Sequence, residues 1–259
     1  MPESEQQKMY NGTVIFRAVI TSNGLKFPSC EFHPNEPGVE KVLIESPSGY
    51  EILSTVHLTN VATEEVGRAI ATKVIIAALD RISFGYSSAV EKSQITSSQF
   101  APVNPPPGAN ILIHTGDLVI IGEQRNLIVG LSAASIKTEL ERVSPPGERL
   151  FGLFRSARRS MGPVEEFMHL YNVLLMLCNK GLSRELQENV DTFILDEEPA
   201  VQQSPHPLFS GVKETVYTRL RNEFAHARAG VNLDDTKLEM ATHLGGLIPL
   251  TKRAIELRH

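Results

Sequence analysis

The hydrophobic pattern of the chain changes its period at one segment, Ser144-Pro145-Pro146-Gly147. Before this segment, runs rich in β-branched residues surround helical stretches, whereas after it apolar residues recur at steps of three and four. Two prolines followed by glycine end a helix and favour a turn. A chain of 259 residues is long enough for two domains of ordinary size. We therefore predict an α+β fold: a mixed strand and helix domain over residues 1–143, of unassigned role, and an all-helical domain over residues 148–259.

Strands are expected to dominate the first domain, because β-branched residues cluster there between turn-forming segments. The predicted strands are Thr13–Thr21, Glu40–Glu45, Glu51–Thr59, Ile111–His114, Leu118–Ile121 and Leu127–Val129. Thr63 precedes two glutamates and is the predicted N-cap of a helix that continues to about Ile82. The proline-rich segment Gln99–Ala109 is predicted to be a loop, since each proline lacks a backbone donor.

Helices are expected from Ser132 onward. They are predicted at Ser132–Arg142, Glu148–Met161, Pro163–Asn179 and Gly211–Arg228, and a last helix, with Asp234 or Asp235 as its cap, is predicted to continue to about Leu257. Pro249 and the Gly245-Gly246 pair are expected to bend the last of these helices. The segment Asp191–His206 is acidic and interrupted by proline, which favours a loop.

The charge of the chain argues against one broad class of function. The formal net charge is -5, whereas a protein that coats nucleic acid carries a strong positive excess. Residues 1–140 hold 10 Lys and Arg against 14 Asp and Glu, and residues 141–259 hold 15 against 16. Any contact with nucleic acid is therefore expected at a local site.

Several features predict a cytoplasmic protein without disulfides or membrane contact. The longest apolar runs, Val74 to Leu79 and Val173 to Cys178, are six residues each, and a spanning helix needs about 20. The N-terminal sequence MPESEQQKMYNG lacks the apolar region of a secretion signal. Cys30 and Cys178 lie far apart and fit neither a disulfide framework nor a metal knuckle.

Common signatures of cofactor and metal chemistry are missing from the sequence. The glycines are scattered and form no phosphate-binding loop, and there is no nucleophile elbow and no His-Glu-x-x-His pair. Most histidines lack partners at ligand spacing and are expected to be surface or hydrogen-bonded residues: His33, His57, His114, His169, His206, His243 and His259. No cofactor and no metal are predicted.

One segment combines polar residues suited to chemistry with an amphipathic helix. In Arg221-Asn222-Glu223-Phe224-Ala225-His226, the arginine and the histidine are five positions apart, or about 140° around a helix axis. Asn222 and His226 are four apart and share a face. The apolar series Val212, Val216, Leu220 and Phe224 lies beside them. Arg221, Asn222 and His226 are therefore expected at the margin of the buried face, where side chains can converge.

This segment resembles the R-x4–6-H motif of HEPN domains (higher eukaryote and prokaryote nucleotide-binding), in which a polar residue, often Asn, commonly follows the Arg. The spacings Arg219 to His226 and Arg253 to His259 also fit, but only Arg221 is followed by Asn. The helix LYNVLLML before the motif and the helix ending LTKRAIELR after it fit the family's order of long helices. The resemblance covers roughly residues 148–259 and implies an all-α HEPN-like bundle there.

The resemblance implies a metal-independent endoribonuclease in which two copies of the motif face each other across a homodimer. RNA supplies the nucleophile, its 2′-OH, so the protein needs an acid, a base and a cation. His226 would transfer protons and Arg221 would stabilise charge on the phosphate oxygens. Asn222 would orient His226 or bind the phosphate, and its replacement should harm activity less than loss of the other two. The setting implied is a toxin or phage-defence effector, with an antitoxin or other regulator as a possible partner.

Two further interpretations stay open at this level. Arg155, Arg158 and Arg159 share one predicted helix and form either an RNA-tracking patch or a solvated helix face. The motif itself has a structural alternative, in which Arg221 pairs with Glu214 or Glu165 and His226 bonds to a backbone carbonyl. The domain would then be a catalytically silent HEPN-like module for dimerisation or ligand binding. A catalytic pair needs both side chains, Arg221 and His226, open to solvent in a groove, whereas a structural His226 should be buried and bonded.

Overall fold

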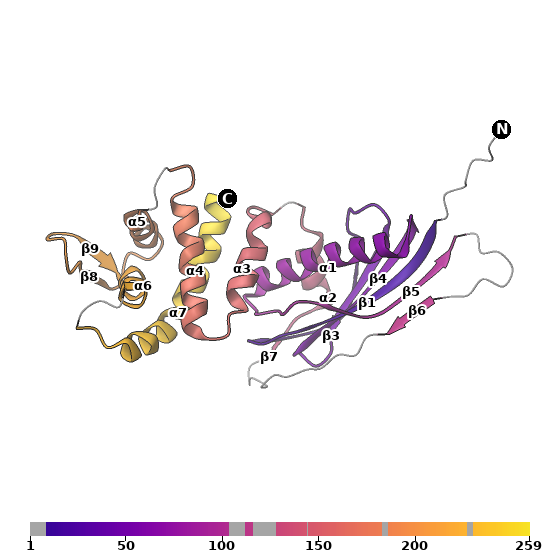
Figure 1. The fold of residues 1–259 in the computed structure, drawn as a ribbon, viewed down its shortest axis with the longest axis horizontal. Helices are drawn as coiled ribbons and strands as arrows, with labels where there is room; N and C mark the ends of the chain where they lie inside the picture. The colour runs from indigo at the N-terminus through magenta and orange to yellow at the C-terminus, as the bar shows by residue number, and fades with distance from the viewer. Residues whose placement is uncertain (1–8, 104–111, 116–127, 144, 183–185, 227–229) are drawn as a thin grey trace. The chain divides into compact units, whose positions relative to one another are not determined.

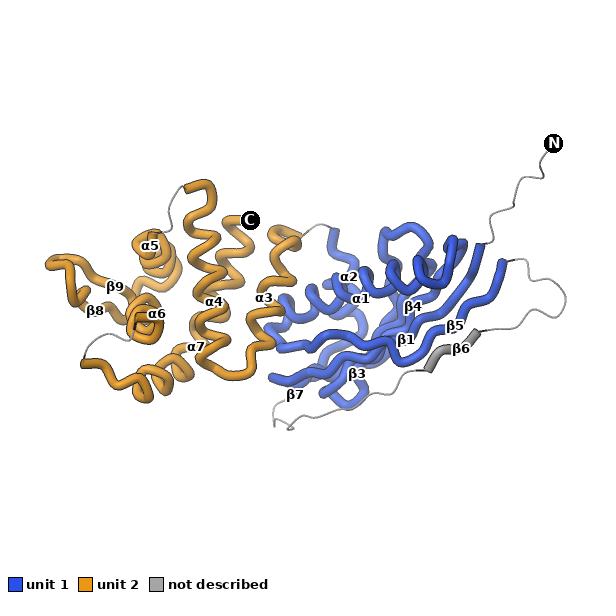
Figure 2. The backbone as a smooth tube through the Cα atoms, in the orientation of Figure 1, with its two compact units in different colours: residues 1–143 blue, residues 144–259 orange. Residues whose placement is uncertain are grey.

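The computed structural model describes residues 9–103, 112–115, 128–143, 145–182, 186–226 and 230–259. The chain divides into two compact units, residues 1–143 and 144–259, as Figure 2 shows. The division falls at the Pro-Pro-Gly segment where the hydrophobic period changes. The fold is mixed α+β.

Unit 1 is built on one seven-stranded sheet with the strand order β6-β5-β1-β4-β3-β2-β7. All neighbouring strands are antiparallel except β2 and β7, which run parallel. The strands are β1 Tyr10–Val19, β2 Gly24–Phe32, β3 Val39–Ser46, β4 Glu51–Val61, β5 Gln94–Pro102, β6 Leu112–Thr115 and β7 Ile128–Gly130. The helices in the described part of this unit are α1 Glu64–Tyr86 and α2 Ala133–Glu141.

One face of this sheet carries the core of unit 1. Alternate residues of the central strands are buried, such as Val14 and Phe16 in β1 and Ile52 and Val56 in β4. They belong to the same apolar cluster as the buried side of α1, which lies along the sheet in Figure 1. The predicted cap of α1 is confirmed, because Thr63 Oγ1 accepts the backbone N–H of Val66 at 3.1 Å.

Unit 2 packs helices around α4, with a small two-stranded sheet at one side. Its elements are η1 Glu148–Leu150, α3 Phe151–Arg158, α4 Pro163–Cys178, α5 Gln187–Glu197, β8 Gln203–Pro205, β9 Lys213–Thr215, α6 Val216–His226 and α7 Leu233–Arg258. Most apolar residues of α4 are buried, including Phe167, Leu170 and Leu174, and α4 packs on α3, α5, α6 and α7. The prediction of an all-helical domain was wrong in one respect, since β8 pairs antiparallel with β9.

The last helix contains both of its predicted irregularities. Pro249 lies inside α7, and Figure 1 shows that the N-terminal and C-terminal halves of α7 run in different directions. Gly246 permits a close contact, because a Cβ atom there would clash with the hydroxyl of Tyr217 on α6. The predicted cap was wrong: Asn232, rather than Asp234 or Asp235, caps α7 by accepting the Asp234 backbone N–H at 3.1 Å.

Several predicted boundaries differ from the structure for identifiable reasons. Strand β2 was missed because Pro28 interrupts its pattern, and its register on β3 shifts between Phe27 and Cys30, on either side of that proline. Strand β5 extends into the predicted loop Gln99–Ala109 as far as Pro102. Most of that loop and the predicted strand Leu118–Ile121 lie outside the described residues.

Unit 2 shows two further differences, both next to the motif. The predicted loop Asp191–His206 begins inside helix α5, whose Val190, Phe193 and Ile194 are buried at helical spacing. The predicted helix Gly211–Arg228 begins late, at Val216, because residues 213–215 form strand β9. In the described parts of the chain, no helix is both long and apolar enough to span a bilayer.

Candidate functional site

The three motif residues lie on α6 in very different environments. Asn222 is 3% exposed, Arg221 is half-buried, and His226 is exposed at the C-terminal end of the helix. The helix is anchored by buried Val216, Tyr217 and Leu220. At its start, Thr215 Oγ1 accepts the backbone N–H of Thr218 at 3.4 Å, in the manner of an N-cap.

Arg221 and His226 approach each other directly. Arg221 Nη1 lies 3.4 Å from His226 Nε2. A guanidinium has donors only, so the imidazole nitrogen must accept, and a neutral His226 ring then carries its proton on Nδ1. The contact is long for a hydrogen bond, so a better donor is able to replace Arg221 at His226 Nε2. The pair thus offers a cation beside an accessible base.

Asn222 uses all four hydrogen-bonding positions of its amide inside unit 2. Its Oδ1 accepts from Gln187 Nε2 at 2.7 Å and from Arg221 Nη1 at 3.0 Å. Its Nδ2 donates to Gln187 Oε1 at 2.7 Å and to Glu214 Oε2 at 3.1 Å. Asn222 therefore contacts Arg221. The sequence had instead suggested His226 or a phosphate as its partner.

A second layer of buried polar groups lies next to this amide. Asp191 Oδ1 accepts from the backbone N–H and hydroxyl of Thr215, at 3.0 and 2.7 Å, and from Thr218 Oγ1 at 2.6 Å. The Tyr171 hydroxyl lies 2.8 Å from Thr218 Oγ1. Burial raises the pKa of Asp191 above its ordinary value, although the bonds from Thr218 and Thr215 oppose this shift. Burial also raises the pKa of Tyr171, so its phenol stays protonated.

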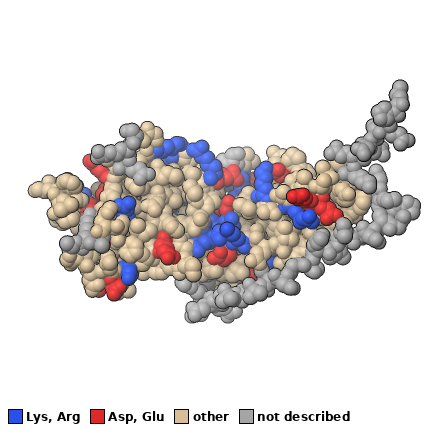
Figure 3. Space-filling view, in the orientation of Figure 1, with Lys and Arg blue, Asp and Glu red and all other residues tan. Residues whose placement is uncertain are grey.

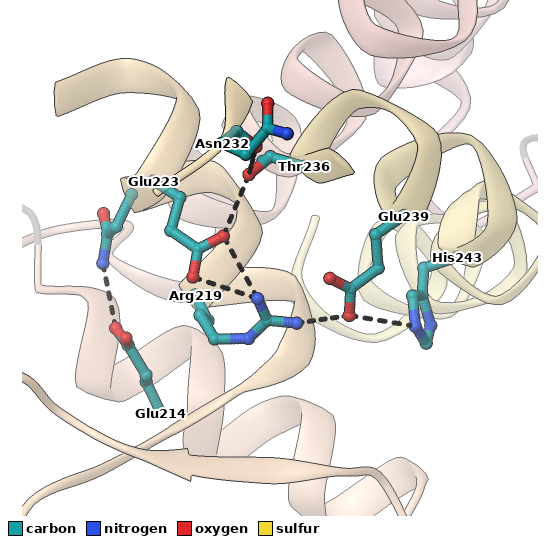
Figure 4. A network of polar contacts seen from close by, with 8 residues as sticks. Glu214, Arg219, Glu223, Asn232, Thr236, Glu239 and His243 are labelled. Atoms are coloured by element: carbon teal, nitrogen blue, oxygen red, sulfur yellow. Dashed lines mark hydrogen bonds and ion pairs between the residues drawn. The ribbon is translucent and has the colours of Figure 1, made fainter. Parts of the chain in front are cut away.

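The second arginine of the helix has a structural role. Arg219 Nη1 donates to both carboxylate oxygens of Glu223, at 3.0 and 3.1 Å, and Nη2 bonds to Glu239 of α7. Figure 4 shows this network continuing from Glu223 to Thr236 and from Glu239 to His243. Arg219 therefore ties α6 to α7. The carboxylate of Glu214, seen in the same view, belongs instead to the Asn222 cluster.

The remaining sequence-predicted residues do not join the site. The spacing from Arg253 to His259 also fits the motif, but these two residues have other partners. Arg253 pairs with Glu197 at 3.2 Å, and His259 Nδ1 lies 3.2 Å from the carbonyl oxygen of Glu256. Arg155 and Arg158 are 6% and 7% exposed, Arg158 pairs with Glu166, and Arg159 is half-buried. The predicted RNA-tracking patch is corrected accordingly: Arg155 and Arg158 do not form an open cationic surface.

Sequence reasoning missed two residues that contact the motif amide or the layer beside it. Gln187 begins α5, in a stretch to which no element was assigned, and Asp191 was placed in a loop. The spacing of Val190, Phe193 and Ile194 was the signal that could have revealed this helix. Glu214 was considered as a partner of Arg221, whereas the structure bonds it to Asn222.

Charge on the molecular surface is mixed. On the face shown in Figure 3, Lys and Arg side chains lie beside Asp and Glu side chains in several places. This distribution agrees with the net charge of -5 and favours a local site over broad nucleic-acid coating. Within the described residues, no group of three or more His, Cys, Asp or Glu side chains is placed to hold a metal ion.

Comparison with known proteins adds no relative: no family model matches the chain, and neither a curated protein nor a solved structure is significantly similar to it.

Proposed function

We propose that unit 2 is a HEPN-like domain and that the protein is a metal-independent endoribonuclease with Arg221 and His226 as its catalytic pair. The observation that carries this proposal is the 3.4 Å approach of Arg221 Nη1 to an exposed His226 Nε2. His226 is open to solvent at a helix end, as a catalytic base must be.

The proposed reaction needs only groups that the pair supplies. His226 Nε2 takes the proton of the RNA 2′-OH, and the freed oxygen attacks the adjacent phosphorus. The new O2′–P bond forms as the P–O5′ bond breaks, which leaves a 2′,3′-cyclic phosphate and a 5′-OH. Arg221 stabilises the negative charge that develops on the non-bridging oxygens. The proton for O5′ comes from a second histidine, supplied by His226 of a second copy in a homodimer.

The deciding experiment incubates purified protein with mixed RNAs in EDTA and compares wild type with His226→Ala. His169→Ala is the matched control, since His169 is also an exposed helix histidine of unit 2 and lies 2.8 Å from Ser160 Oγ. We expect cleavage by the wild type and by the control, with cyclic phosphate ends, and none by His226→Ala. Cleavage in EDTA that survives His226→Ala would move the site elsewhere. No cleavage by the wild type would favour the silent module.

A further inference from the structure

We propose that Gln187 is a positioning residue of this site: through the amide of Asn222 it holds the Arg221 guanidinium against His226. The inference rests on the proposed function for its catalytic consequence, but its structural content concerns only unit 2. Gln187 lies on α5, 35 positions before Asn222 in the chain, and is joined to it by two hydrogen bonds of 2.7 Å.

The first step concerns how Arg221 is held. An arginine side chain loses much rotamer freedom when it is fixed, so a half-buried one needs a defined acceptor. Arg221 Nη1 donates to Asn222 Oδ1 at 3.0 Å, a shorter contact than its 3.4 Å approach to His226. The position of Asn222 Oδ1 thus sets where the guanidinium lies.

The second step concerns how Asn222 itself is oriented. Glu214 is 2% exposed, and its carboxylate is an acceptor when ionised, so it requires the NH₂ group of Asn222 on its side. That requirement turns Oδ1 toward Arg221, which has only donors. A flipped amide would place oxygen against carboxylate and NH₂ against guanidinium, and both contacts would be repulsive.

The third step identifies Gln187 as the member that fixes this geometry. Its amide pairs with that of Asn222 through both the donor and the acceptor, so the two planes constrain each other. Without Gln187, one donor and one acceptor position of the buried Asn222 amide lose their partners, and the contacts with Glu214 and Arg221 then hold its plane less tightly. Gln187 is half-buried, so its replacement disturbs the core less than replacement of Asn222.

The test compares Gln187→Leu with Asn189→Ala in the full-length protein. Asn189 lies in the same first turn of α5 and donates to Asn179 Oδ1 at 2.8 Å, so its loss removes a hydrogen bond without touching Asn222. The first readout is the ¹⁵N spectrum of the His226 ring at about pH 8, where a free imidazole is neutral. We expect the Nδ1-protonated tautomer in wild type and Asn189→Ala, and a mixture of tautomers in Gln187→Leu.

The second readout is RNA cleavage. Displacement of a charge-stabilising group by about 1 Å costs up to ~10²-fold in rate, so Gln187→Leu should lower kcat by about 10- to 100-fold while KM changes little. An unchanged His226 tautomer together with activity equal to that of Asn189→Ala would overturn the proposal. If the wild type cleaves no RNA, the proposed function fails, and the tautomer measurement alone still decides whether Gln187 positions Arg221.

Discussion

The guanidinium of Arg221 lies 3.4 Å from the imidazole of His226, although the two residues are five positions apart on α6 and project about 140° from each other around its axis. The length of the arginine side chain closes this angular gap, and Asn222 holds it there through a 3.0 Å hydrogen bond. The spacing in the motif therefore suffices to bring cation and base together within one chain.

The first prediction concerns this pair. Arg221→Ala and His226→Ala should each remove most RNase activity, because proton transfer by one histidine contributes ~10²–10⁴-fold and one charge-stabilising donor roughly 3 kcal/mol. Initial rates on a defined RNA in EDTA measure both effects. His226→Ala should leave the unfolding midpoint unchanged, since the side chain is exposed. The rate should follow a bell in pH if two copies of His226 act as base and acid.

The second prediction concerns Asn222. The sequence predicted only a smaller loss of activity when this residue is replaced, but because its side chain is buried we also expect a loss of stability. Asn222→Ala removes the hydrogen bonds that this amide makes with Gln187 and Glu214, and Asn222 is itself only 3% exposed, so we expect a loss of about 2–4 kcal/mol in unfolding free energy. Asn222→Asp should be worse, because a carboxylate would face Glu214. Urea unfolding of both variants beside Asn189→Ala measures the difference. A change below about 1 kcal/mol in Asn222→Ala would contradict the hydrogen-bonded amide described above.

How far the sequence predicts this site depends on whether the contacts are local or distant. Arg221, Asn222 and His226 lie on one helix, so their proximity follows from helical periodicity. Gln187 and Asp191 join this polar cluster from another helix, α5. Gln187 bonds to Asn222, 35 positions away, and Asp191 bonds to Thr218, 27 positions away. Helical periodicity does not predict such contacts, because they depend on how α5 packs against α6. In unit 1, runs of β-branched residues predict strands β1, β3 and β4. Strand β2 is not predicted, because Pro28 interrupts its pattern.

The third prediction concerns the oligomeric state that the proposed reaction requires. Most apolar residues of α4 are buried within the chain, although Met176 is 40% exposed. Exposed apolar side chains of unit 2 include Val212 at 47% and Leu238 at 71%. We still expect a homodimer, because in the proposed reaction the acid and the base come from two copies. Light scattering that shows a 28.5 kDa monomer at micromolar concentration would refute it.

The fourth prediction concerns the pH dependence of stability through Asp191. Its pKa is raised in the folded protein, chiefly by burial, so the folded state binds a proton more tightly than the unfolded state. The stability contribution is complete below the ordinary carboxyl pKa of about 3.9 and is lost as pH rises through the raised value. Asp191→Asn removes this dependence. Urea unfolding across pH should show wild type losing stability relative to Asp191→Asn as pH rises, and parallel curves would contradict the raised pKa.

The fifth prediction separates two adjacent glycines of α7. A Cβ atom at Gly246 would clash with the hydroxyl of Tyr217, whereas one at Gly245 would meet nothing within 4 Å. Tyr217 is 2% exposed and its ring is rigid, so Gly246→Ala should displace it and cost about 1–3 kcal/mol. Gly245→Ala gains helix propensity and should stabilise the protein by up to about 1 kcal/mol. Thermal unfolding of the two variants should therefore shift in opposite directions, and equal shifts would show that Tyr217 does not pack against the backbone of α7.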